Sequence, residues 1–433
     1  MSEHFQPTRS VPSRRDFIKS STAAIVGGGL VGSLGIARSA HAAGSDTIRV
    51  GLIGCGGRGT GAAANALHTP GSVKLVAMGD AFADRLEQSL REIQKEAPDR
   101  VEVPSENRFV GFDAYEKVIA SDVDLVILAT PPGFRPIHLA AAVEAGKHVF
   151  MEKPVAVDAP GVRAVLAATE AAKQKNLAIG VGLQRHHENS YLETMKRLHD
   201  GAIGDIIATR AYWNGAGVWV RPRKPDQTDM EYQMRNWYYF NWLCGDHIVE
   251  QHIHNLDVIN WLKRGYPVQA QGMGGRQVRT GPEYGEIFDH HAVEFEYADG
   301  SRMFSYCRHI ANCWDSQSEH AHGTKGTADI TRALIQANGS DGWRYRGERN
   351  NPYQTEHDDL FASIRSASPL NEGEFGALSS MTAILGRMAT YSGKMITWEQ
   401  ALESELSLAP SAYAFDAAPP TPGVAVPGHT EVV

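Results

Sequence analysis

The sequence predicts an α/β protein that begins with a doubly wound parallel sheet and contains antiparallel strands in its second half. The first observation is that short apolar strands alternate with helices over residues 46–175, which is typical of a parallel sheet covered by helices. The second is a glycine-rich turn at residues 54–59, between the first strand and the first helix. The third is a hairpin pattern around an Asp-Gly turn at residues 299–300, which predicts antiparallel strands.

The composition indicates a folded globular protein. The 433 residues are 42% hydrophobic and 21% charged, an ordinary balance that supplies a large core and argues against general disorder. At about 150 residues per domain, the length suggests two or three domains. The formal charge of −8 is opposite to that of a surface that binds nucleic acid, so we expect no nucleic acid partner. The four cysteines form no CxxC pair, which indicates neither a disulfide framework nor a zinc ribbon.

The first 42 residues have the pattern of an export signal. Paired arginines precede Phe, Ile and Lys at residues 13–19, an apolar glycine-rich stretch follows at 22–36, and residues 40–42 form a small-x-small cleavage site. This order resembles a twin-arginine signal peptide. A membrane anchor is the alternative, but the apolar run is shorter than the ~20 residues of a span. We therefore expect cleavage after Ala42, export to the periplasm by the twin-arginine machinery, and no membrane attachment afterwards.

A strand, a glycine-rich turn and a helix then form the pattern of a dinucleotide-binding unit. Residues 48–53 read as a buried parallel strand and residues 62–67 as the following helix. Between them, Gly54 permits a tight turn, Gly56 lets the backbone approach a pyrophosphate, and Gly59 lets the helix pack on the strand. The helix N-terminus presents its free N–H groups to the phosphates. The predicted phosphate-binding residues are Gly54, Gly56, Gly57, Arg58 and Gly59.

Asp80 follows the second predicted strand, residues 73–78. An acidic side chain at this place accepts hydrogen bonds from the adenosine ribose hydroxyls and repels a 2′-phosphate, which favours NAD over NADP. The alternative interpretation of Asp80 is the N-cap of the next helix. Arg85 lies one turn into that helix. Because an arginine there can bind a 2′-phosphate, NADP is the alternative cofactor.

Two further strands end at polar residues on the same edge of the predicted sheet. Residues 124–129 are followed by Thr130, and residues 148–151 are followed by Glu152 and Lys153. Ligands of doubly wound sheets bind beyond the carboxyl ends of the strands. The residues that mark this edge are Gly54, Asp80, Thr130 and Lys153.

The second half of the chain combines the hairpin with helices and a tail. Residues 287–297 and 303–306 flank the Asp-Gly turn as two antiparallel strands, and residues 358–366 and 377–391 have helical periodicity. From residue 409 the chain is rich in Ala and Pro, which predicts an irregular tail that could strap a neighbouring subunit. The expected segments are 1–42 for the signal, 46–175 and 176–408 for two domains, and 409–433 for the tail.

Several segments resemble the glucose–fructose oxidoreductase / inositol dehydrogenase / MocA family. The most specific is the run 145–154, which ends in Glu-Lys-Pro, together with the upstream glycine loop. The other matching segments are 130–132, His138, 182–188, 323–326, 386–387 and 392–398. The resemblance implies an N-terminal Rossmann domain and a C-terminal α/β domain with a large, mostly antiparallel sheet that covers the nicotinamide. It also implies a homo-oligomer, a dimer or a tetramer, with this second sheet at the interface.

The same resemblance implies further residues of the site. Those that would bind the nucleotide are Thr130, Pro131, His138, Glu152, Lys153, Gln184 and Arg185. His254 would be the general base that takes a hydroxyl proton while hydride leaves to the nicotinamide, and Lys153 would assist it electrostatically. Glu250, where the family usually has Asp, keeps the charge on a longer arm and is the third expected catalytic residue.

Residues 245–259 read as one helix with Asp246 as a candidate N-cap. At helical spacing, the residues that share one face are His247, Glu250, His254 and Asp257, and His252 points elsewhere. A metal is the alternative for His247, Glu250 and His254, but their spacing is not that of a His-Glu-x-x-His site, and we predict no metal. The histidines without an assigned role are His186, His187, His247, His252, His290 and His291, of which the last two point to opposite faces of a strand.

Aromatic residues gather before this predicted helix. They are Tyr212, Trp213, Trp219 and the run 237–242, interleaved with Arg221, Arg235 and Asn236. Apolar faces of a sugar stack on such rings while charged and amide groups bind its hydroxyls. The alternative is an ordinary buried aromatic core.

These observations predict an NAD(P)-dependent oxidoreductase that acts on a sugar or polyol. Export restricts the chemistry, because free nicotinamide cofactor is scarce outside the cytoplasm, so we expect bound NAD that does not dissociate. The alternative is a glycoside-cleaving enzyme, a glycosidase or lyase, that uses NAD for transient oxidation of its substrate. A non-enzymatic sugar-binding or assembly protein is a third interpretation, against which the presence of Lys153 and His254 argues.

Overall fold

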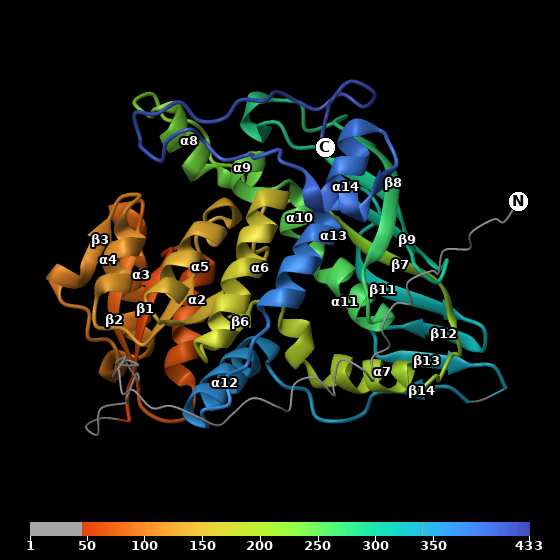
Figure 1. Cartoon of the computed structure of the whole chain (residues 1–433), viewed down its shortest axis with the longest axis horizontal. Helices are drawn as coiled ribbons and strands as arrows, with labels where there is room; N and C mark the ends of the chain where they lie inside the picture. Colours follow the sequence, from red (N-terminus) through yellow and green to blue (C-terminus); the bar gives the residue numbers. More distant parts are fainter. Residues whose placement is uncertain (1–45, 340) are drawn as a thin grey trace, which may run out of the picture. The chain divides into compact units, whose positions relative to one another are not determined.

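The computed structural model describes residues 46–339 and 341–433 and contains two β-sheets in that range (Figure 1). The predicted signal peptide, residues 1–42, lies outside the described residues. No helix of the described part is long and apolar enough to cross a membrane. The four cysteines are free thiols, as the absence of a CxxC pair predicted.

The first sheet is parallel, with the strand order β3-β2-β1-β4-β5-β6 in the described part of the chain. Its strands are β1 (Ile48–Ile53), β2 (Val73–Asp80), β3 (Arg108–Val110), β4 (Leu125–Leu128), β5 (His148–Met151) and β6 (Ile179–Val181). All pairings between neighbours are parallel, which confirms the predicted doubly wound sheet. The sheet continues to Val181, so the boundary expected at residue 175 falls before its last strand.

Helices cover this sheet because its strands are apolar on both faces. Those that follow its strands are α2 (Gly57–His68), α3 (Ala83–Glu96), α4 (Ala114–Ala120), α5 (Arg135–Glu144) and α6 (Ala159–Gln174). A helix from the second half of the chain, α12 (Pro352–Arg365), packs beside α2 (Figure 1). Its buried Leu360 and Phe361 belong to the same core cluster as Leu52 of β1.

The second sheet has the order β14-β13-β12-β11-β7-β10-β9-β8-β15 among the described residues. Its strands are β7 (Ile206–Gly215), β8 (Pro267–Gly275), β9 (His290–Tyr297), β10 (Arg302–His309), β11 (Ser316–Gly323), β12 (Gly326–Asp329), β13 (Leu334–Ala337), β14 (Trp343–Arg344) and β15 (Ile396–Thr397). In the described range, β7 and β10 form its one parallel pair, and the other neighbours are antiparallel. The large, mostly antiparallel sheet is therefore confirmed.

The predicted hairpin is formed by β9 and β10, which pair antiparallel from Arg302 opposite Glu296 to Arg308 opposite His290. Alternate residues of β9 are buried, as expected for a strand with one covered face. The long helix α13 (Gly373–Ser392) supplies that cover and runs between the two sheets (Figure 1). The remaining helices are α7 (Asn189–His199), α8 (Asp229–Arg235), α9 (Asn241–Cys244), α10 (His247–Glu250), α11 (Ile253–Lys263) and α14 (Trp398–Glu403).

The tail from residue 409 to 433 contains no helix or strand, as the Ala/Pro-rich sequence predicted. It packs on its own chain: the Phe415 ring lies 4.8 Å from that of Phe112 and 5.5 Å from that of Phe82, between ring centroids. Thr228 Oγ1 also donates a hydrogen bond to Phe415 O at 2.7 Å. The tail therefore contacts loops that follow β2 and β3 of its own chain, and the strap over a neighbouring subunit stays a prediction.

Candidate active site

A cavity of about 350 Å³ lies at the carboxyl ends of β1, β2 and β4. The predicted nucleotide-binding residues that line it are Gly54, Gly56, Gly57, Arg58, Asp80, Thr130, Pro131 and His138. We call this cavity the dinucleotide groove. It lies where ligands of doubly wound sheets bind, because the strand ends and helix N-termini meet there.

The glycine loop has the backbone geometry that the motif requires. Gly54 has φ +97°, and a Cβ there would lie 2.5 Å from Thr130 N. A Cβ on Gly59 would lie 1.9 Å from Gly54 O, so only glycine lets α2 pack this closely on the loop. A Cβ on Gly56 would meet no atom within 4 Å, because Gly56 faces the groove. Gly54 and Gly59 therefore have the turn and packing geometry that the sequence predicted, and the approach of Gly56 to a pyrophosphate stays a prediction.

Substitution of these glycines by alanine is expected to separate folding from nucleotide binding. Gly59→Ala should lower the free energy of unfolding by about 1–3 kcal/mol, because its Cβ overlaps a backbone atom. Gly56→Ala should leave that free energy unchanged and weaken nucleotide binding. Gly61→Ala is the matched control in α2, since its Cβ would contact only Arg58 Nη1 at 3.6 Å. Thermal unfolding and nucleotide titration measure both effects, and a Gly59→Ala variant as stable as Gly61→Ala would contradict the packing argument.

Asp80 lies at the end of β2 and is held by two backbone donors. Its Oδ2 accepts a hydrogen bond from Cys55 N at 2.6 Å, and its Oδ1 accepts one from Phe82 N at 2.9 Å. The N-cap of α3 is Phe82, so the N-cap interpretation of Asp80 is wrong. Burial raises the pKa of the Asp80 carboxyl above its usual value. Arg85 also lines the groove, so Asp80, which favours NAD, and Arg85, which would accommodate NADP, both lie in it.

Arg135 is a residue of this site that sequence reasoning missed. Its side chain is buried, and its guanidinium donates to Glu152 O at 2.9 Å, to Thr130 Oγ1 at 3.1 Å and to Thr130 O at 2.6 Å. It thereby ties the loop after β4 to the loop after β5. Burial lowers the pKa of Arg135 to about 10, so the side chain stays charged at neutral pH. No local sequence pattern distinguishes an arginine in the first turn of a helix that joins two loops from any other arginine.

Arg58 joins the glycine loop to two buried carboxylates. Its Nε donates to Glu152 Oε1, and its Nη2 lies 3.2 Å from Glu356 Oε1, on α12. The guanidinium also lies over the Tyr353 ring, 4.9 Å from its centroid. Burial, and then the neighbouring charge of Glu152, raises the pKa of Glu356 well above its usual value. The second half of the chain therefore helps to hold the phosphate-binding loop.

A second cavity, of about 400 Å³, contains the three predicted catalytic residues Lys153, Glu250 and His254. We call it the catalytic cavity. The other predicted residues that line it are Arg58, Thr130, Glu152, Gln184 and Arg185. It shares Arg58, Ala129, Thr130 and Trp237 with the dinucleotide groove. A nucleotide in the groove would therefore reach toward Lys153, Glu250 and His254.

Lys153 and Glu250 form a buried pair in the catalytic cavity. Lys153 Nζ donates to Glu250 O at 2.8 Å and to Glu250 Oε1 at 3.1 Å. The Lys153 side chain is 11% exposed and that of Glu250 is 9% exposed, so water screens the pair little. A buried ammonium needs such partners to remain charged. The arrangement fixes Lys153 Nζ at the wall of the catalytic cavity.

His254 is 8% exposed and faces the same cavity. Burial, and then the charges of Lys153, Arg185 and Arg58, lowers the pKa of His254 well below its usual value. The imidazole is therefore neutral at pH 7 and can accept a proton. Its ring stacks on that of Trp213, with 5.8 Å between the centroids.

The expected helix over 245–259 is interrupted, and the face predicted for it is not kept. A turn at Gln251 and His252 separates α10 from α11. The turn buries His252, whose Nε2 lies 2.8 Å from Ser305 Oγ. Glu250 and His254 both reach the catalytic cavity, whereas the His247 ring stacks on that of His309, with 4.2 Å between the centroids.

The other half of the predicted polar face has a structural role. Asp257 Oδ2 lies 2.8 Å from His186 Nε2, and Ser379 Oγ donates to Asp257 Oδ1 at 2.8 Å. His187 lies between Asp359 and Glu372, with its ring nitrogens 2.7 and 3.0 Å from their carboxylates. Neither His186 nor His187 is among the residues that line the catalytic cavity.

The aromatic residues divide between site and core. Trp213 and Trp237 line the catalytic cavity, and Trp219 lines the dinucleotide groove. The side chains that form buried core are Tyr238, Tyr239, Phe240 and Trp242. Tyr212, next to Trp213 on β7, points to the opposite side of the sheet and stacks on Tyr306 at 5.6 Å between centroids. The core interpretation is therefore confirmed for these buried rings, and the sugar-binding interpretation stays a prediction for Trp213, Trp219 and Trp237.

Two family models match the chain in succession. One is described as an oxidoreductase family with an NAD-binding Rossmann fold and matches residues 48–183. The other is described as a GFO/IDH/MocA C-terminal domain and matches residues 191–329. Together they cover both the glycine loop and the segment that carries Glu250 and His254.

Curated relatives and solved structures agree with these matches. Inositol 2-dehydrogenase of Rhizobium meliloti is 26% identical over 65% of this chain and 74% of its own. The scyllo-inositol 2-dehydrogenase (NAD(+)) of Bacillus subtilis is 29% identical over 40% of this chain and 46% of its own. The chain spans about half the length of most of the curated relatives that it matches. Scyllo-inositol dehydrogenase from Lactobacillus casei, solved with NAD(H) and scyllo-inositol, has the same fold, with a TM-score of 0.62 at 20% identity over 82% of this chain and 99% of its own.

Proposed function

The chain belongs to the GFO/IDH/MocA family of NAD-binding oxidoreductases, and from that premise we propose that it oxidises a hydroxyl group of a sugar or polyol with NAD as hydride acceptor. One observation carries the proposal. Lys153, Glu250 and His254 line a cavity that shares its wall with the dinucleotide groove. A substrate hydroxyl in this cavity would have a base, a cation and the nucleotide within reach.

The residues of the catalytic cavity fit the needs of alcohol oxidation. Bound NAD supplies the acceptor for the hydride that leaves the carbinol carbon. His254, neutral because burial lowers its pKa, accepts the hydroxyl proton. The Lys153 ammonium stabilises the negative charge that develops on the substrate oxygen. Glu250 orients Lys153 through the two hydrogen bonds that it accepts.

The walls of the catalytic cavity suit a cyclic polyol or a pyranose. Trp213 and Trp237 offer flat apolar surfaces, and Gln184, Arg185 and Gln317 offer polar groups. Rings that carry hydroxyls at their edges present apolar C–H faces to indoles and donors and acceptors to amides and guanidinium groups. Two of the relatives named above are inositol dehydrogenases, which supports this substrate class.

For the cofactor we propose NAD. Asp80 lies in the groove with its carboxylate fixed by Cys55 N and Phe82 N. A 2′-phosphate placed there would meet a second negative charge, whereas ribose hydroxyls would donate to the carboxylate.

We further propose that the protein is exported through its twin-arginine signal with NAD already bound, and that it keeps this NAD. Protein isolated from the periplasm and then denatured is expected to release close to one NAD per chain. Absorbance and mass spectrometry of the released nucleotide measure this. The Gly56→Ala variant is the matched control, because it alters the surface that faces the phosphates.

The same preparation tests the reaction. Incubation with inositols and aldoses, while the absorbance of bound reduced nicotinamide is followed, should show lasting reduction with the true substrate. Periplasmic protein without nicotinamide nucleotide would overturn the retention of NAD. Release of an aglycone from an aryl glycoside without lasting reduction would overturn the dehydrogenase and indicate bond cleavage through transient oxidation.

We also propose that the protein forms a homo-oligomer through the outer face of the second sheet. Large apolar side chains are exposed on that side of the chain, among them Met273, which is 77% exposed, and Trp314, which is 63% exposed. Exposed apolar groups of this size are typical of interfaces. Light scattering of the wild type and of a Met273→Glu variant tests the assembly.

A further inference from the structure

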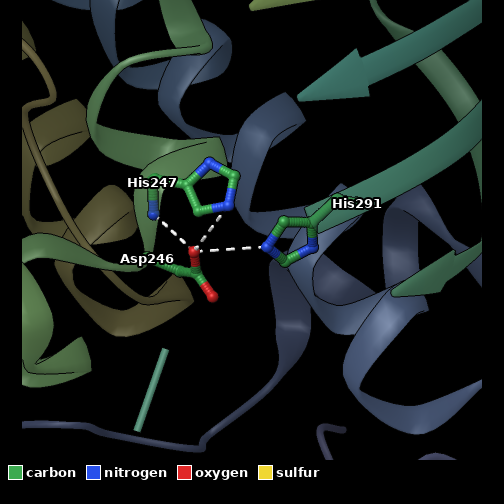
Figure 2. Close-up of side chains that lie close together, drawn as sticks. All are labelled: Asp246, His247 and His291. Atoms are coloured by element: carbon green, nitrogen blue, oxygen red, sulfur yellow. Dashed lines mark hydrogen bonds and ion pairs between the residues drawn. The ribbon is translucent and has the colours of Figure 1, made fainter. Parts of the chain in front are cut away.

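A cluster of three buried side chains lies outside both cavities, between α10 and the second sheet. Asp246 precedes α10, His247 is the first residue of α10, and His291 belongs to β9. Asp246 and His247 are 0% exposed and His291 is 2% exposed. Figure 2 shows that the Asp246 carboxylate lies between the two imidazole rings. One atom of each side chain lies within 4.8 Å of one atom of each of the others.

Hydrogen-bond donors fix the Asp246 carboxylate and leave one side of its Oδ1 atom without a donor. Its Oδ2 accepts hydrogen bonds from Tyr391 Oη at 2.6 Å and from Phe288 N at 2.9 Å. Its Oδ1 accepts one from His247 N. The same Oδ1 lies 3.2 Å from His291 Nε2 and 3.8 Å from His247 Nε2 (Figure 2). The second lone pair of Oδ1 therefore points at the space between the imidazoles.

The two imidazoles are arranged as metal ligands are. His291 Nδ1 lies 2.9 Å from Thr390 Oγ1, which leaves Nε2 to face Asp246. A ligating histidine characteristically has its other ring nitrogen bonded in this way. Neither ring nitrogen of His247 has a hydrogen-bond partner among the described residues.

We propose that Asp246 Oδ1, His247 Nε2 and His291 Nε2 bind a divalent metal ion of the zinc class. Tetrahedral zinc holds nitrogen and oxygen ligands at about 2.0–2.2 Å, which places ligand atoms about 3.4 Å from one another. The two distances from Asp246 Oδ1, 3.2 and 3.8 Å, lie on either side of that value. Two imidazoles and one carboxylate suit zinc, whereas calcium and magnesium take oxygen ligands. Three protein ligands leave the fourth position to a water molecule.

An ion pair between His291 and Asp246 is the competing explanation. It accounts for the 3.2 Å contact, but it leaves both ring nitrogens of His247 buried without partners. Buried polar groups without partners are rare, because each loses its hydrogen bonds to water. A metal ion between the rings gives His247 Nε2 a partner as well as His291 Nε2, and it leaves only His247 Nδ1 without one. The proposal differs from the sequence-based prediction of no metal, which considered His247 together with Glu250 and His254 on one helix.

The position of the cluster gives the metal a structural role. It would link α10 to β9, and α10 ends at Glu250, which holds Lys153 in the catalytic cavity. The ligands are completely buried, so the ion would enter during folding and leave only on unfolding. The inference concerns metal content and does not depend on the proposed sugar oxidation.

The test is the metal content of the full chain. Wild-type protein, dialysed against EDTA in the native state, is expected to keep close to one zinc-class ion per chain in elemental analysis and to release it on denaturation. Refolding with Co²⁺ should produce the intense visible absorption of a four-coordinate Co²⁺ site. His291→Gln should lose the ion. His357→Gln is the matched control, because His357 is equally buried in α12 and its Nε2 also lacks a partner among the described residues, and it should keep the ion.

Two results would overturn the proposal. One is a wild type that contains no metal as isolated and takes up neither Zn²⁺ nor Co²⁺ on refolding. The other is a His291→Gln variant that binds as much metal as the wild type. If His291→Gln does not fold, the metal content and the Co²⁺ spectrum of the wild type decide the question alone.

Discussion

Replacing Lys153 with methionine is expected to lower kcat for polyol oxidation about 10³-fold, equivalent to about 4 kcal/mol of transition-state stabilisation. Methionine keeps most of the side-chain volume and removes the ammonium that donates to Glu250 at 2.8 and 3.1 Å. The loss should fall on kcat, since the charge acts on the oxygen whose negative charge develops during the reaction. Single-turnover kinetics, in which the reduction of bound NAD is followed at saturating substrate, measure this.

Three controls make the result specific. Lys117→Met removes an exposed lysine that pairs with Asp113 on the surface, and it should leave kcat unchanged. Lys153→Arg should not restore the rate, because the planar guanidinium cannot take the place of a compact ammonium. His254→Asn should lower kcat by about 10²–10⁴-fold, and the double variant should be little worse than the worse single variant if both side chains serve one proton transfer. A Lys153→Met variant within tenfold of the wild type would remove Lys153 from the mechanism.

Acid is expected to unfold the protein steeply between about pH 6.5 and pH 4. Six histidines are buried in the neutral form, and burial is the first cause in each. The pKa values of His138, His252, His309 and His357 are lowered to about 3, and those of His247 and His254 are lowered well below their usual value. In the unfolded chain these side chains titrate near 6.5. The unfolded state therefore binds more protons than the folded state at every pH in this window, and stability falls as the pH falls.

One histidine acts in the opposite direction. Burial disfavours the charge on His187, but Glu372 and Asp359 outweigh it and raise the pKa of His187, so its charged form supports the fold at low pH. Burial also raises the pKa of three carboxyls, that of Glu286 to about 7 and those of Asp80 and Glu356 above their usual values, so these groups too bind protons in the folded state. Six histidines less these four groups leave about two protons, or about 3 kcal/mol of stability per pH unit, as an order of magnitude. Urea unfolding at a series of pH values measures the slope. His357→Gln should lower the slope by the contribution of about one proton. A free energy of unfolding that stays constant from pH 7 to pH 5 would contradict the argument.

The first sheet and the glycine loop could be predicted because their signals are local. The strand Leu125–Leu128 is apolar throughout and buried throughout, and a short apolar run between turns is sufficient to predict it. Gly54 has a positive φ of +97° in the turn, and Gly59 is required by Gly54 O of the same turn, so the short motif is sufficient to predict both glycines. The hairpin of β9 and β10 likewise followed from alternation and an Asp-Gly turn.

The residues that form the site were harder to predict from the sequence. Arg135 holds Thr130 and Glu152, yet no spacing in the sequence distinguishes it from other arginines. Trp213 and Tyr212 are neighbours with the same predicted role, and only the register of β7 against β10 and β11 decides which of them faces His254. Because a one-residue shift reverses the faces of a strand, such a choice depends on the whole sheet.

By itself, the sequence determined the parallel sheet and the position of Gly54, Asp80, Thr130 and Lys153 at the carboxyl ends of its strands, because strand ends and glycine turns can be recognised from short local patterns. Only the tertiary structure decided how the segment after Gly245 divides its polar residues. The turn at His252 sends Glu250 and His254 to the catalytic cavity and leaves His247 beside His291, a residue of another element. Helical spacing assumes an unbroken helix, and the contacts that interrupt this one come from β9 and β10, which are distant in the chain.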